Sequence, residues 1–213
     1  MNNTTDTSLC KLNIASCAIH VLKLQTAARA TGCDGKLIVA SYGQNPVTGD
    51  TLRPIVQHVS PMGDQQEIAR VILELSAQPH RNVYMPLCLM RPDLPTGKKG
   101  GESDVVAVFG LVADFDDNEA HRWRDRLPHP PDYVLETSSG RFQAGYILDR
   151  GIPVDQAKAV AEKLQGYSKC DFGTKDVCHV WRIPGTLNWP NKKKVSSGRN
   201  PEPQMVGVVN VER

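Results

Sequence analysis

Three aspartates at the end of an apolar run are the residues of this chain best suited to chemistry. The run at 105–113 carries no charge and is rich in β-branched residues, which predicts a buried strand, and Asp114, Asp116 and Asp117 follow it directly. Because side chains alternate along a strand, Asp114 and Asp116 are expected on one face. Adjacent carboxylates repel each other unless a cation lies between them, and Mg²⁺ and Mn²⁺ prefer oxygen ligands and often bind phosphates too. The pattern therefore indicates metal-assisted phosphate chemistry.

Aspartates at a strand end also have structural explanations. Aspartate is common in turns and at helix N-termini, and Asp117 is placed to cap a helix expected to begin near Asn118. Enzymes that transfer sugars use Asp-x-Asp as well. On this motif alone, a metal site, a solvated strand end and a sugar-transfer site all stay open.

A second polar segment, Ser-Ser-Gly-Arg-Phe-Gln at 138–143, joins two β-like runs. Such a turn can offer backbone N–H groups and a guanidinium to a phosphate, although Ser-Ser-Gly is also ordinary turn chemistry. The segment predicts a β-hairpin and only weakly predicts a phosphate contact.

A third group follows near the C-terminal end. Asp171 is a candidate third carboxylate, and Arg182, at the end of a short apolar strand, suits bidentate phosphate recognition. The lysines at 192–194, and those at 98–99 in a Gly-rich loop, suit a nucleic-acid backbone or a triphosphate, although a solvated loop explains 192–194 equally well. The 98–99 loop is not a P-loop, because the required Gly and Ser/Thr spacing and the following helix are absent.

Composition limits the class of protein. The 213 residues carry a net charge of +2, so any nucleic-acid binding must come from local patches. There is no apolar stretch of membrane-spanning length, and the N-terminus lacks the basic region of a secretory signal, so we expect a cytoplasmic protein with no membrane partner. A zinc site at Cys170, Cys178 and His179 is not favoured, because none of the six cysteines forms a Cys-x-x-Cys pair.

The elements that must position these residues can be read from periodicity. Helices are expected over 15–30, with Ile19, Leu22 and Ala27 facing inward, and after a capping box at 64–67. Others are expected over 118–126, whose three arginines form a solvated face, and over 152–167, with Ala157, Val160, Ala161 and Leu164 facing inward. Strands are expected at 36–42, 82–90, 105–113, 133–136, 142–148, 178–183 and 204–211, and a loop or hairpin at 43–62. This mixture predicts an α+β fold with a mostly antiparallel sheet.

The order of the motifs resembles the catalytic core of archaeo-eukaryotic-type primases. Asp-Phe-Asp, Ser-Ser-Gly-Arg-Phe-Gln, Asp171 and Trp-Arg-Ile-Pro-Gly-Thr-Leu-Asn are most similar to the RepB-like and primase-polymerase branch of plasmids, phages and other mobile elements. The resemblance covers roughly residues 65–195, and Arg-Ile-Pro-Gly-Thr-Leu-Asn is its most specific part. It implies an RRM-like, mostly antiparallel sheet flanked by helices, with a small N-terminal α/β subdomain.

The resemblance also implies a domain organisation. Residues 1–213 would form a single primase-polymerase domain, in which 1–62 belong to the α/β unit and 63–213 hold the core with all three motifs. Primases of this kind are often fused to a helicase or a priming-helper domain, so the chain is also compatible with a core excised from a longer protein.

The resemblance also implies which residues bind metal ions, nucleotide and nucleic acid. Two Mg²⁺ or Mn²⁺ ions would bind Asp114, Asp116 and Asp171, while nucleotide contacts would come from Ser139, Arg141, Gln143, Arg182 and Asn188. Nucleic-acid contacts would come from Lys192, Lys193, Lys194, Lys98 and Lys99. The family usually carries a histidine near the place of Gln143. A glutamine donates hydrogen bonds but carries no charge, so the arginines would have to supply the positive field.

The implied function is template-directed nucleotidyl transfer from NTPs or dNTPs on single-stranded DNA, making or extending primers. Two alternatives use the same residues: a non-catalytic nucleic-acid-binding module and a metal-dependent nuclease. A nicking replication protein of the HUH type is disfavoured, because the chain has no His-x-His pair.

Overall fold

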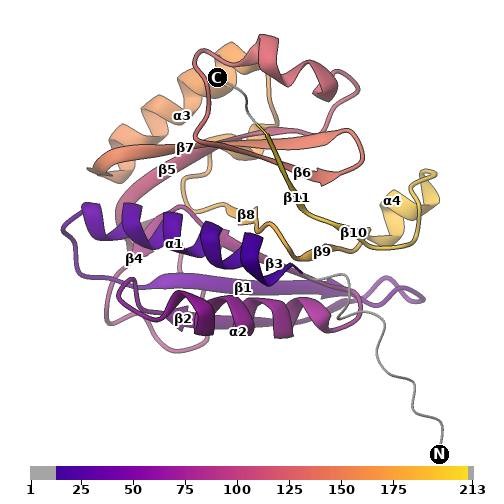
Figure 1. The fold of residues 1–213 in the computed structure, drawn as a ribbon, viewed down its shortest axis with the longest axis horizontal. Helices are drawn as coiled ribbons and strands as arrows, with labels where there is room; N and C mark the ends of the chain where they lie inside the picture. The colour runs from indigo at the N-terminus through magenta and orange to yellow at the C-terminus, as the bar shows by residue number, and fades with distance from the viewer. Residues whose placement is uncertain (1–12, 211–213) are drawn as a thin grey trace, which may run out of the picture.

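Two antiparallel sheets form the framework of the computed structural model, which describes residues 13–210 (Figure 1). The larger sheet has the order β11-β6-β7-β5-β4, the smaller has the order β2-β1-β3-β8, and β10 pairs with β9 in a separate ribbon. Cys10 and the N-terminal segment considered for a secretion signal lie outside the described residues. The predicted α+β fold with a mostly antiparallel sheet is confirmed.

The strands are β1 (Leu37–Gln44), β2 (Thr51–Val59), β3 (Arg81–Pro86), β4 (Cys88–Met90), β5 (Val105–Phe115), β6 (Tyr133–Ser138), β7 (Arg141–Ile152), β8 (Val180–Arg182), β9 (Leu187–Asn188), β10 (Gln204–Met205) and β11 (Gly207–Val209). The helices are α1 (Ile14–Ala30), α2 (Gln65–Ala77), α3 (Val154–Ser168) and α4 (Lys192–Ser196), with short 3-10 segments η2 (Glu102–Asp104), η3 (Ala120–Arg126) and η4 (Phe172–Lys175). The loop or hairpin expected at 43–62 is the β1–β2 hairpin.

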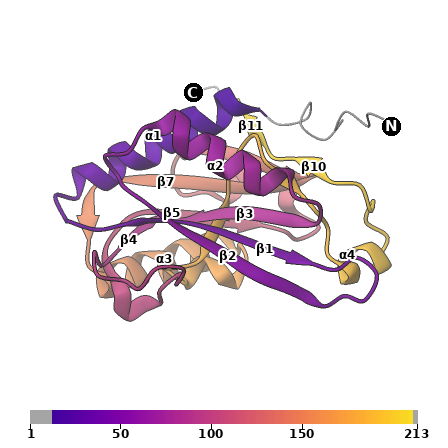
Figure 2. The same cartoon turned by 90° about the horizontal axis from the view of Figure 1, so that it is seen from below.

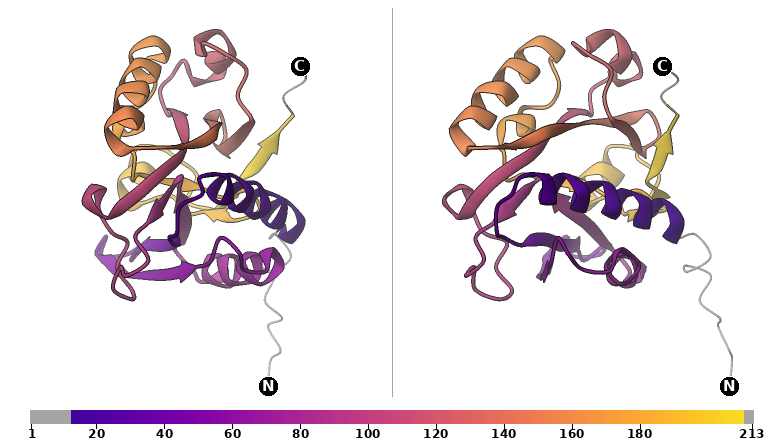
Figure 3. Two further views of the ribbon diagram at one scale, coloured as in Figure 1. Left: turned by 90° about the vertical axis from the view of Figure 1, so that its left-hand side faces the viewer. Right: turned by 60° about the vertical axis from the view of Figure 1, so that its left-hand side comes forward.

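Helices cover the two sheets from different sides. Figures 1 and 3 show α3 and η3 on the outer side of the larger sheet, while α1 lies between that sheet and the smaller one. Leu111, Ala113 and Phe115 of β5 pack in one apolar cluster with α3, and Val112 packs with α1 in the other. Asp114 lies two residues after Val112, so it shares the inner face of β5.

The chain passes from one sheet to the other at Leu87. The sequence predicts one strand over 82–90, but the structure divides it into β3 of the smaller sheet and β4 of the larger one. Pro86, predicted at an edge or a bulge, has no N–H and ends β3. This crossing ties the β3–β8 pair closely to β5, which pairs with β4.

The inward face of α1 differs from the sequence prediction, whereas that of α3 is confirmed at Ala157, Ala161 and Leu164 and is wrong only at Val160. Ile19 and Leu22 of α1 are 67% and 39% exposed, and Val160 of α3 is 44% exposed. The buried stripe of α1 instead combines Val21 and Leu24 with small residues and with polar residues such as Gln25, which is why apolar periodicity misplaces the face. The helix after Asp64 is confirmed, and the Asp64 carboxylate accepts N–H groups of its first turn.

Two findings concern cysteines and membranes. The five cysteines within the described part, Cys17, Cys33, Cys88, Cys170 and Cys178, are free thiols. Over residues 13–210, no helix combines the length and the apolar character that crossing a bilayer requires.

Candidate active site

Asp114 lies at the inner face of β5, directly across from Gln143 of β7. Burial, together with the negative charges of Asp116 and Asp171, raises the pKa of Asp114 to about 6, although a hydrogen bond from Gln143 and the charge of Arg182 act in the opposite direction. A carboxylate in this position resists ionisation unless a cation approaches it.

Asp171 comes from a distant part of the chain to lie beside Asp114. Its backbone N–H donates to the Asp114 carbonyl oxygen at 2.7 Å, and the Thr174 hydroxyl accepts the Asp114 N–H at 3.3 Å. The Asp171 carboxylate accepts the Gly173 N–H at 2.7 Å and so caps η4. The structure thus brings the predicted third aspartate next to the first.

Asp116 is held by three basic side chains. Arg199 Nη2 lies 2.8 Å, Arg141 Nε 3.1 Å and Lys194 Nζ 3.4 Å from its carboxylate oxygens. Burial acts to raise the pKa of Asp116, but the hydrogen bond from Arg199 and the charges of Lys194 and Arg199 outweigh it and hold that pKa below its usual range. The structure therefore concentrates positive charge at the end of β5.

The carboxylates are neighbours without forming a coordination shell. Among residues 13–210, no three His, Cys, Asp or Glu side chains converge on one point as metal ligands do. Asp116 is engaged by cations and Asp171 by the η4 cap. The donor set still fits a hard divalent ion, because it consists of carboxylate oxygens and leaves Asp114 with an unfavourable buried charge.

Arg199 is a site residue that the sequence reasoning missed. Besides Asp116, its guanidinium contacts the Ser138 hydroxyl at 3.3 Å. The only signal in the sequence was one more basic residue in a loop rich in Ser, Gly, Asn and Pro, and such a residue is ordinarily solvated. Only the return of the chain toward β10 brings it to the carboxylate.

Arg182 and Gln143 form the inner wall of the site. The Gln143 side-chain oxygen accepts the Arg182 N–H at 3.1 Å, so Gln143 links β7 to β8 as well as contacting Asp114. The Arg182 guanidinium lies over the Tyr84 ring at 4.5 Å, and its buried Nη1 has no hydrogen-bond partner among the described residues. That donor is available to a ligand.

A cavity of about 300 Å³ adjoins Asp116 and contains three of the predicted nucleotide contacts. Ser139, Arg141 and Asn188 line it together with Arg199. Asn188 is held by donating to the Thr137 carbonyl oxygen, and the Ser139 N–H donates to the Gln204 side chain at 2.9 Å. Two arginines and several polar groups outnumber the one acid, Glu202, in its wall, so the cavity suits an anionic group such as a phosphate.

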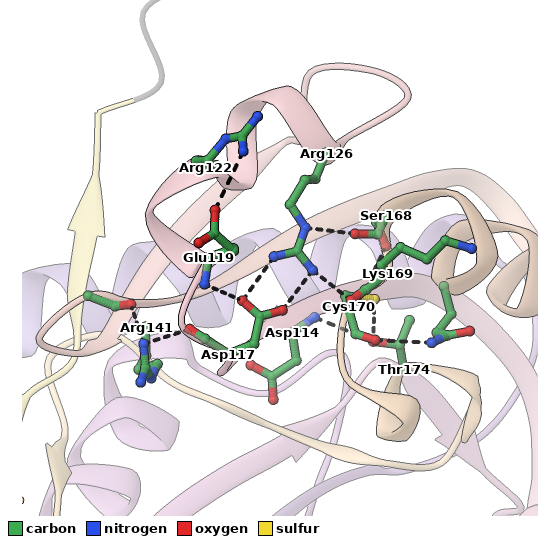
Figure 4. Close-up of polar contacts among 12 residues, drawn as sticks. Asp114, Asp117, Glu119, Arg122, Arg126, Arg141, Ser168, Lys169, Cys170 and Thr174 are labelled. Carbon is green, nitrogen blue, oxygen red and sulfur yellow. Dashed lines mark hydrogen bonds and ion pairs between the residues drawn. The ribbon is translucent and has the colours of Figure 1, made fainter.

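Arg126 joins the end of β5 to the segment that leads into Asp171 (Figure 4). Its guanidinium donates to both carboxylate oxygens of Asp117, at 3.0 and 2.8 Å, and to the carbonyl oxygens of Ser168 and Lys169 at 2.8 and 2.6 Å. The solvated face predicted for this helix is therefore wrong for Arg126. Asp117 also accepts the Glu119 N–H, but the N-cap of η3 is Glu119 and not Asp117, so the predicted capping role of Asp117 is wrong.

The predicted nucleic-acid lysines fall into two separate groups. Lys192 donates to the Val47 carbonyl oxygen at the tip of the β1–β2 hairpin, and Lys194 contacts Asp116. Lys99 donates to the Cys178 carbonyl oxygen, and the Lys98 carbonyl oxygen contacts His58 near the other end of the hairpin. Only the 192–194 group adjoins the carboxylates through a described contact.

The residues considered for zinc are placed in ordinary contacts. The Cys170 thiol lies 3.2 Å from the Thr174 hydroxyl, and the Cys178 thiol lies 3.1 Å from the Asp176 carboxylate. Burial and the Asp176 hydrogen bond raise the pKa of Cys178 to about 11, which disfavours the thiolate that a zinc ligand requires.

Comparison with known families identifies this arrangement. Residues 109–207 match the family described as the RepB DNA-primase N-terminal domain, and this range contains the three aspartates, Arg182 and Arg199. This part of the chain matches a RepB-like primase domain. The family assignment supports DNA priming as the general function of the domain.

Solved structures agree with this fold assignment. The primase domain is similar to the AEP domain of the cyanophage S-2L primase-polymerase, with a TM-score of 0.61 and 14% identity over 93% of this chain and 90% of that one. It is also similar to primase RepB′, with a TM-score of 0.52 and 18% identity over 89% of this chain and 56% of that one. The RepB′ catalytic domain in complex with initiator DNA gives a TM-score of 0.51 and 17% identity over 91% and 85%. No curated protein gives a significant match.

Proposed function

We propose that this primase domain makes or extends DNA primers by metal-dependent, template-directed nucleotidyl transfer. The observation that carries the proposal is the placement of Asp171 beside Asp114, together with Arg141 and Arg199, which contact Asp116 and line a cavity. The substrates are NTPs or dNTPs and a single-stranded DNA template.

Asp114, Asp116 and Asp171 would hold Mg²⁺ or Mn²⁺. When bound, such ions lower the pKa of the attacking 3′-hydroxyl and stabilise the charge on the triphosphate and the pyrophosphate leaving group. Zinc is not part of this proposal. The raised pKa of Asp114 supports the assignment, because a nearby cation would offset both the burial and the repulsion that raise it.

The basic side chains around Asp116 would bind the triphosphate. Arg199, Arg141 and Lys194 pair with Asp116 and would contact phosphate oxygens when this carboxylate holds an ion. Arg182, whose buried Nη1 has no hydrogen-bond partner among the described residues, would donate a further hydrogen bond to the nucleotide. Ser139 and Asn188 would contact the nucleotide from the cavity wall.

Gln143 would act as a positioning residue. Its side chain is almost fully buried and is used by Asp114 and by the Arg182 backbone, so it orients a carboxylate and the strand that carries a phosphate-binding arginine. The family usually has a histidine at this place, and Gln143 lacks its positive charge. Arg141 and Arg182 would supply that charge instead. The helicase or priming-helper partner suggested by the resemblance remains a prediction.

An incorporation assay tests this function. The protein is incubated with single-stranded template, Mg²⁺ or Mn²⁺, and labelled NTPs or dNTPs, with and without a primer. Asp116→Asn is expected to reduce incorporation by at least about 10³-fold, since it removes a metal-binding charge. Asp125→Asn, which changes an acid that is 72% exposed on η3, is the matched control and is expected to retain activity.

Different products separate the alternatives. Incorporation at the wild-type rate by Asp116→Asn, with folding verified by circular dichroism, would contradict the metal role of this aspartate. Template degradation without nucleotides would indicate the nuclease, and metal-independent binding without any product would indicate the non-catalytic binding module.

A further inference from the structure

A second cavity lies at the tip of the β1–β2 hairpin, on the far side of α4 from the carboxylates. It measures about 210 Å³, and its wall contains aromatic rings, neutral amides and a lysine but no acidic residue. The side chains that matter here are Tyr42, Gln44, His80, Asn82, Trp189 and Lys192. Apart from Lys192, none of them belongs to the site described above.

Trp189 is held in this cavity by a double hydrogen bond. The Asn82 side chain accepts the Trp189 N–H at 2.7 Å and donates to the Trp189 carbonyl oxygen at 3.0 Å. The indole lies 4.5 Å from the His80 ring, centroid to centroid. Its Nε1 is buried and has no hydrogen-bond partner within residues 13–210, so one donor in the wall is unused.

His80 adopts a strained backbone conformation beside Trp189. Its φ is +59°, a left-handed value that costs a residue other than glycine about 1–3 kcal/mol. The Gln44 N–H donates to the His80 carbonyl oxygen, and a Cβ on Gly43 would lie only 2.5 Å from that oxygen. The β1–β2 hairpin and the start of β3 therefore pack closely around the rings of His80 and Trp189. Backbone strain of this kind is concentrated at functional sites.

The α4 helix connects this cavity to the catalytic aspartates, as its position beside the hairpin tip shows (Figure 2). At its start, the Lys192 N–H donates to Gln44 at 2.8 Å, and two residues later Lys194 reaches Asp116. A nucleic-acid strand lying along α4 would contact both places. The exposed Lys193 between them is available for a phosphate.

We propose that the cavity around Trp189 binds one base of single-stranded DNA, next to the template position served by the catalytic centre. This rests on the proposed function. Aromatic rings stack on any base, the amides and the indole N–H can hydrogen-bond to base edges, and the lysines of α4 suit the backbone. At about 210 Å³, the cavity is smaller than a usual site for a whole small ligand and suits a single base.

Tryptophan fluorescence and binding of oligo(dT) test the proposal without metal or nucleotides, so the result does not depend on catalysis. Trp189→Ala is expected to weaken oligo(dT) binding about 10-fold or more, because stacking is worth about 1–3 kcal/mol per base. Trp123→Phe, which changes a buried tryptophan of η3, is the control and is expected to keep the wild-type affinity. Wild-type affinity in Trp189→Ala would overturn the proposal.

A measurement on the unmodified protein covers the case in which Trp189→Ala fails to fold. Oligonucleotides containing 5-iodouracil are photo-crosslinked to the wild type, and adducts are expected on Trp189 or His80. Adducts only elsewhere would overturn the site. Equal competition by free dTTP would overturn the template assignment, because the base would then come from a nucleotide. Trp189-dependent binding in a protein without incorporation would contradict the proposed function and leave this site standing.

Discussion

The Asp114 side chain combines burial with two neighbouring negative charges, and this has consequences for stability as well as for chemistry. Its pKa of about 6 means that the folded protein binds a proton at this group more tightly than the unfolded chain does. The stability contributed by the protonated group is complete below about pH 4 and is lost as the pH rises through about 6.

A comparison of wild type with Asp114→Asn across pH tests this. The variant is expected to be more stable by up to about 3 kcal/mol above pH 6, where a pKa shift of about two units is fully expressed, and to lose this advantage near pH 4. Thermal unfolding in EDTA measures it. Adding Mg²⁺ is expected to stabilise the wild type and not the variant.

The control for the comparison of wild type with Asp114→Asn is Asp125→Asn. This variant changes an exposed acid and is expected to show no such pH dependence. A stability difference between wild type and Asp114→Asn that stays constant from pH 4 to pH 8 would contradict the raised pKa.

Arg199 is also expected to be important for nucleotide binding, although no sequence motif marks it. Arg199→Ala is expected to lower kcat/KM for the nucleotide about 10- to 100-fold, mainly through KM, because a charged hydrogen bond to phosphate is worth about 1.5–3 kcal/mol. Steady-state incorporation kinetics measure this, with the exposed Arg150→Ala as control. An unchanged KM for Arg199→Ala would remove Arg199 from the triphosphate site.

At the scale of elements, the site depends on the connection between η3 and the end of α3. Arg126 supplies four hydrogen bonds there, two to the Asp117 carboxylate and two to backbone carbonyls just before Asp171. The Arg126 side chain is only 17% exposed, whereas the Asp117 carboxylate is 47% exposed, so the bond to the Ser168 carbonyl oxygen is the most shielded from water of the four. Through Arg126, the 3-10 segment η3 therefore holds Asp171 in place relative to Asp114.

Arg126→Ala is expected to destabilise the protein by about 2–4 kcal/mol and to reduce incorporation more than the stability loss explains, because the acceptors lose their partner and Asp171 loses its support. Arg122→Ala, on the same segment with a side chain that is 60% exposed, is expected to be nearly neutral. Urea unfolding and incorporation at a temperature where both variants are folded measure the two effects. Equal stability and equal incorporation in Arg126→Ala and Arg122→Ala would show that the Arg126 contacts do not position the site.

At the scale of the whole molecule, binding to DNA must come from a local patch, because the net charge is only +2. The α4 segment places positive charge between the aspartates and the Trp189 cavity. The lysines at 98–99 lie toward the other end of the β1–β2 hairpin. A strand bound at the catalytic centre is thus expected to follow α4.

The salt dependence of oligo(dT) binding tests this path. Lys193→Ala is expected to reduce the slope of log Kd against log salt by about 0.7, the value for one phosphate contact on a single strand. Lys163→Ala, on α3 across the larger sheet, is expected to leave the slope unchanged. A reduced slope for Lys163→Ala together with an unchanged slope for Lys193→Ala would place the DNA path on the α3 side.

Much of this protein follows from local sequence patterns. Alternation in β5 places Asp114 on the same face as Val112, turn residues mark the β6–β7 hairpin, and the order of motifs indicates the family, which the match over residues 109–207 bears out. These features depend on neighbours within a few residues, which is why they are legible in one chain.

Other features depend on contacts between distant segments, and only the tertiary structure decided them. The crossing at Leu87 joins the two sheets, so that Gln143 contacts both Asp114 and the Arg182 backbone. The closing segment brings Arg199 to Asp116, and Arg126 is half-buried in contacts with Asp117 and with backbone carbonyl oxygens, although its helix is predicted to be solvated. A basic side chain looks the same in sequence whether it meets water or a carboxylate, because its partner is set by long-range packing and not by its neighbours along the chain.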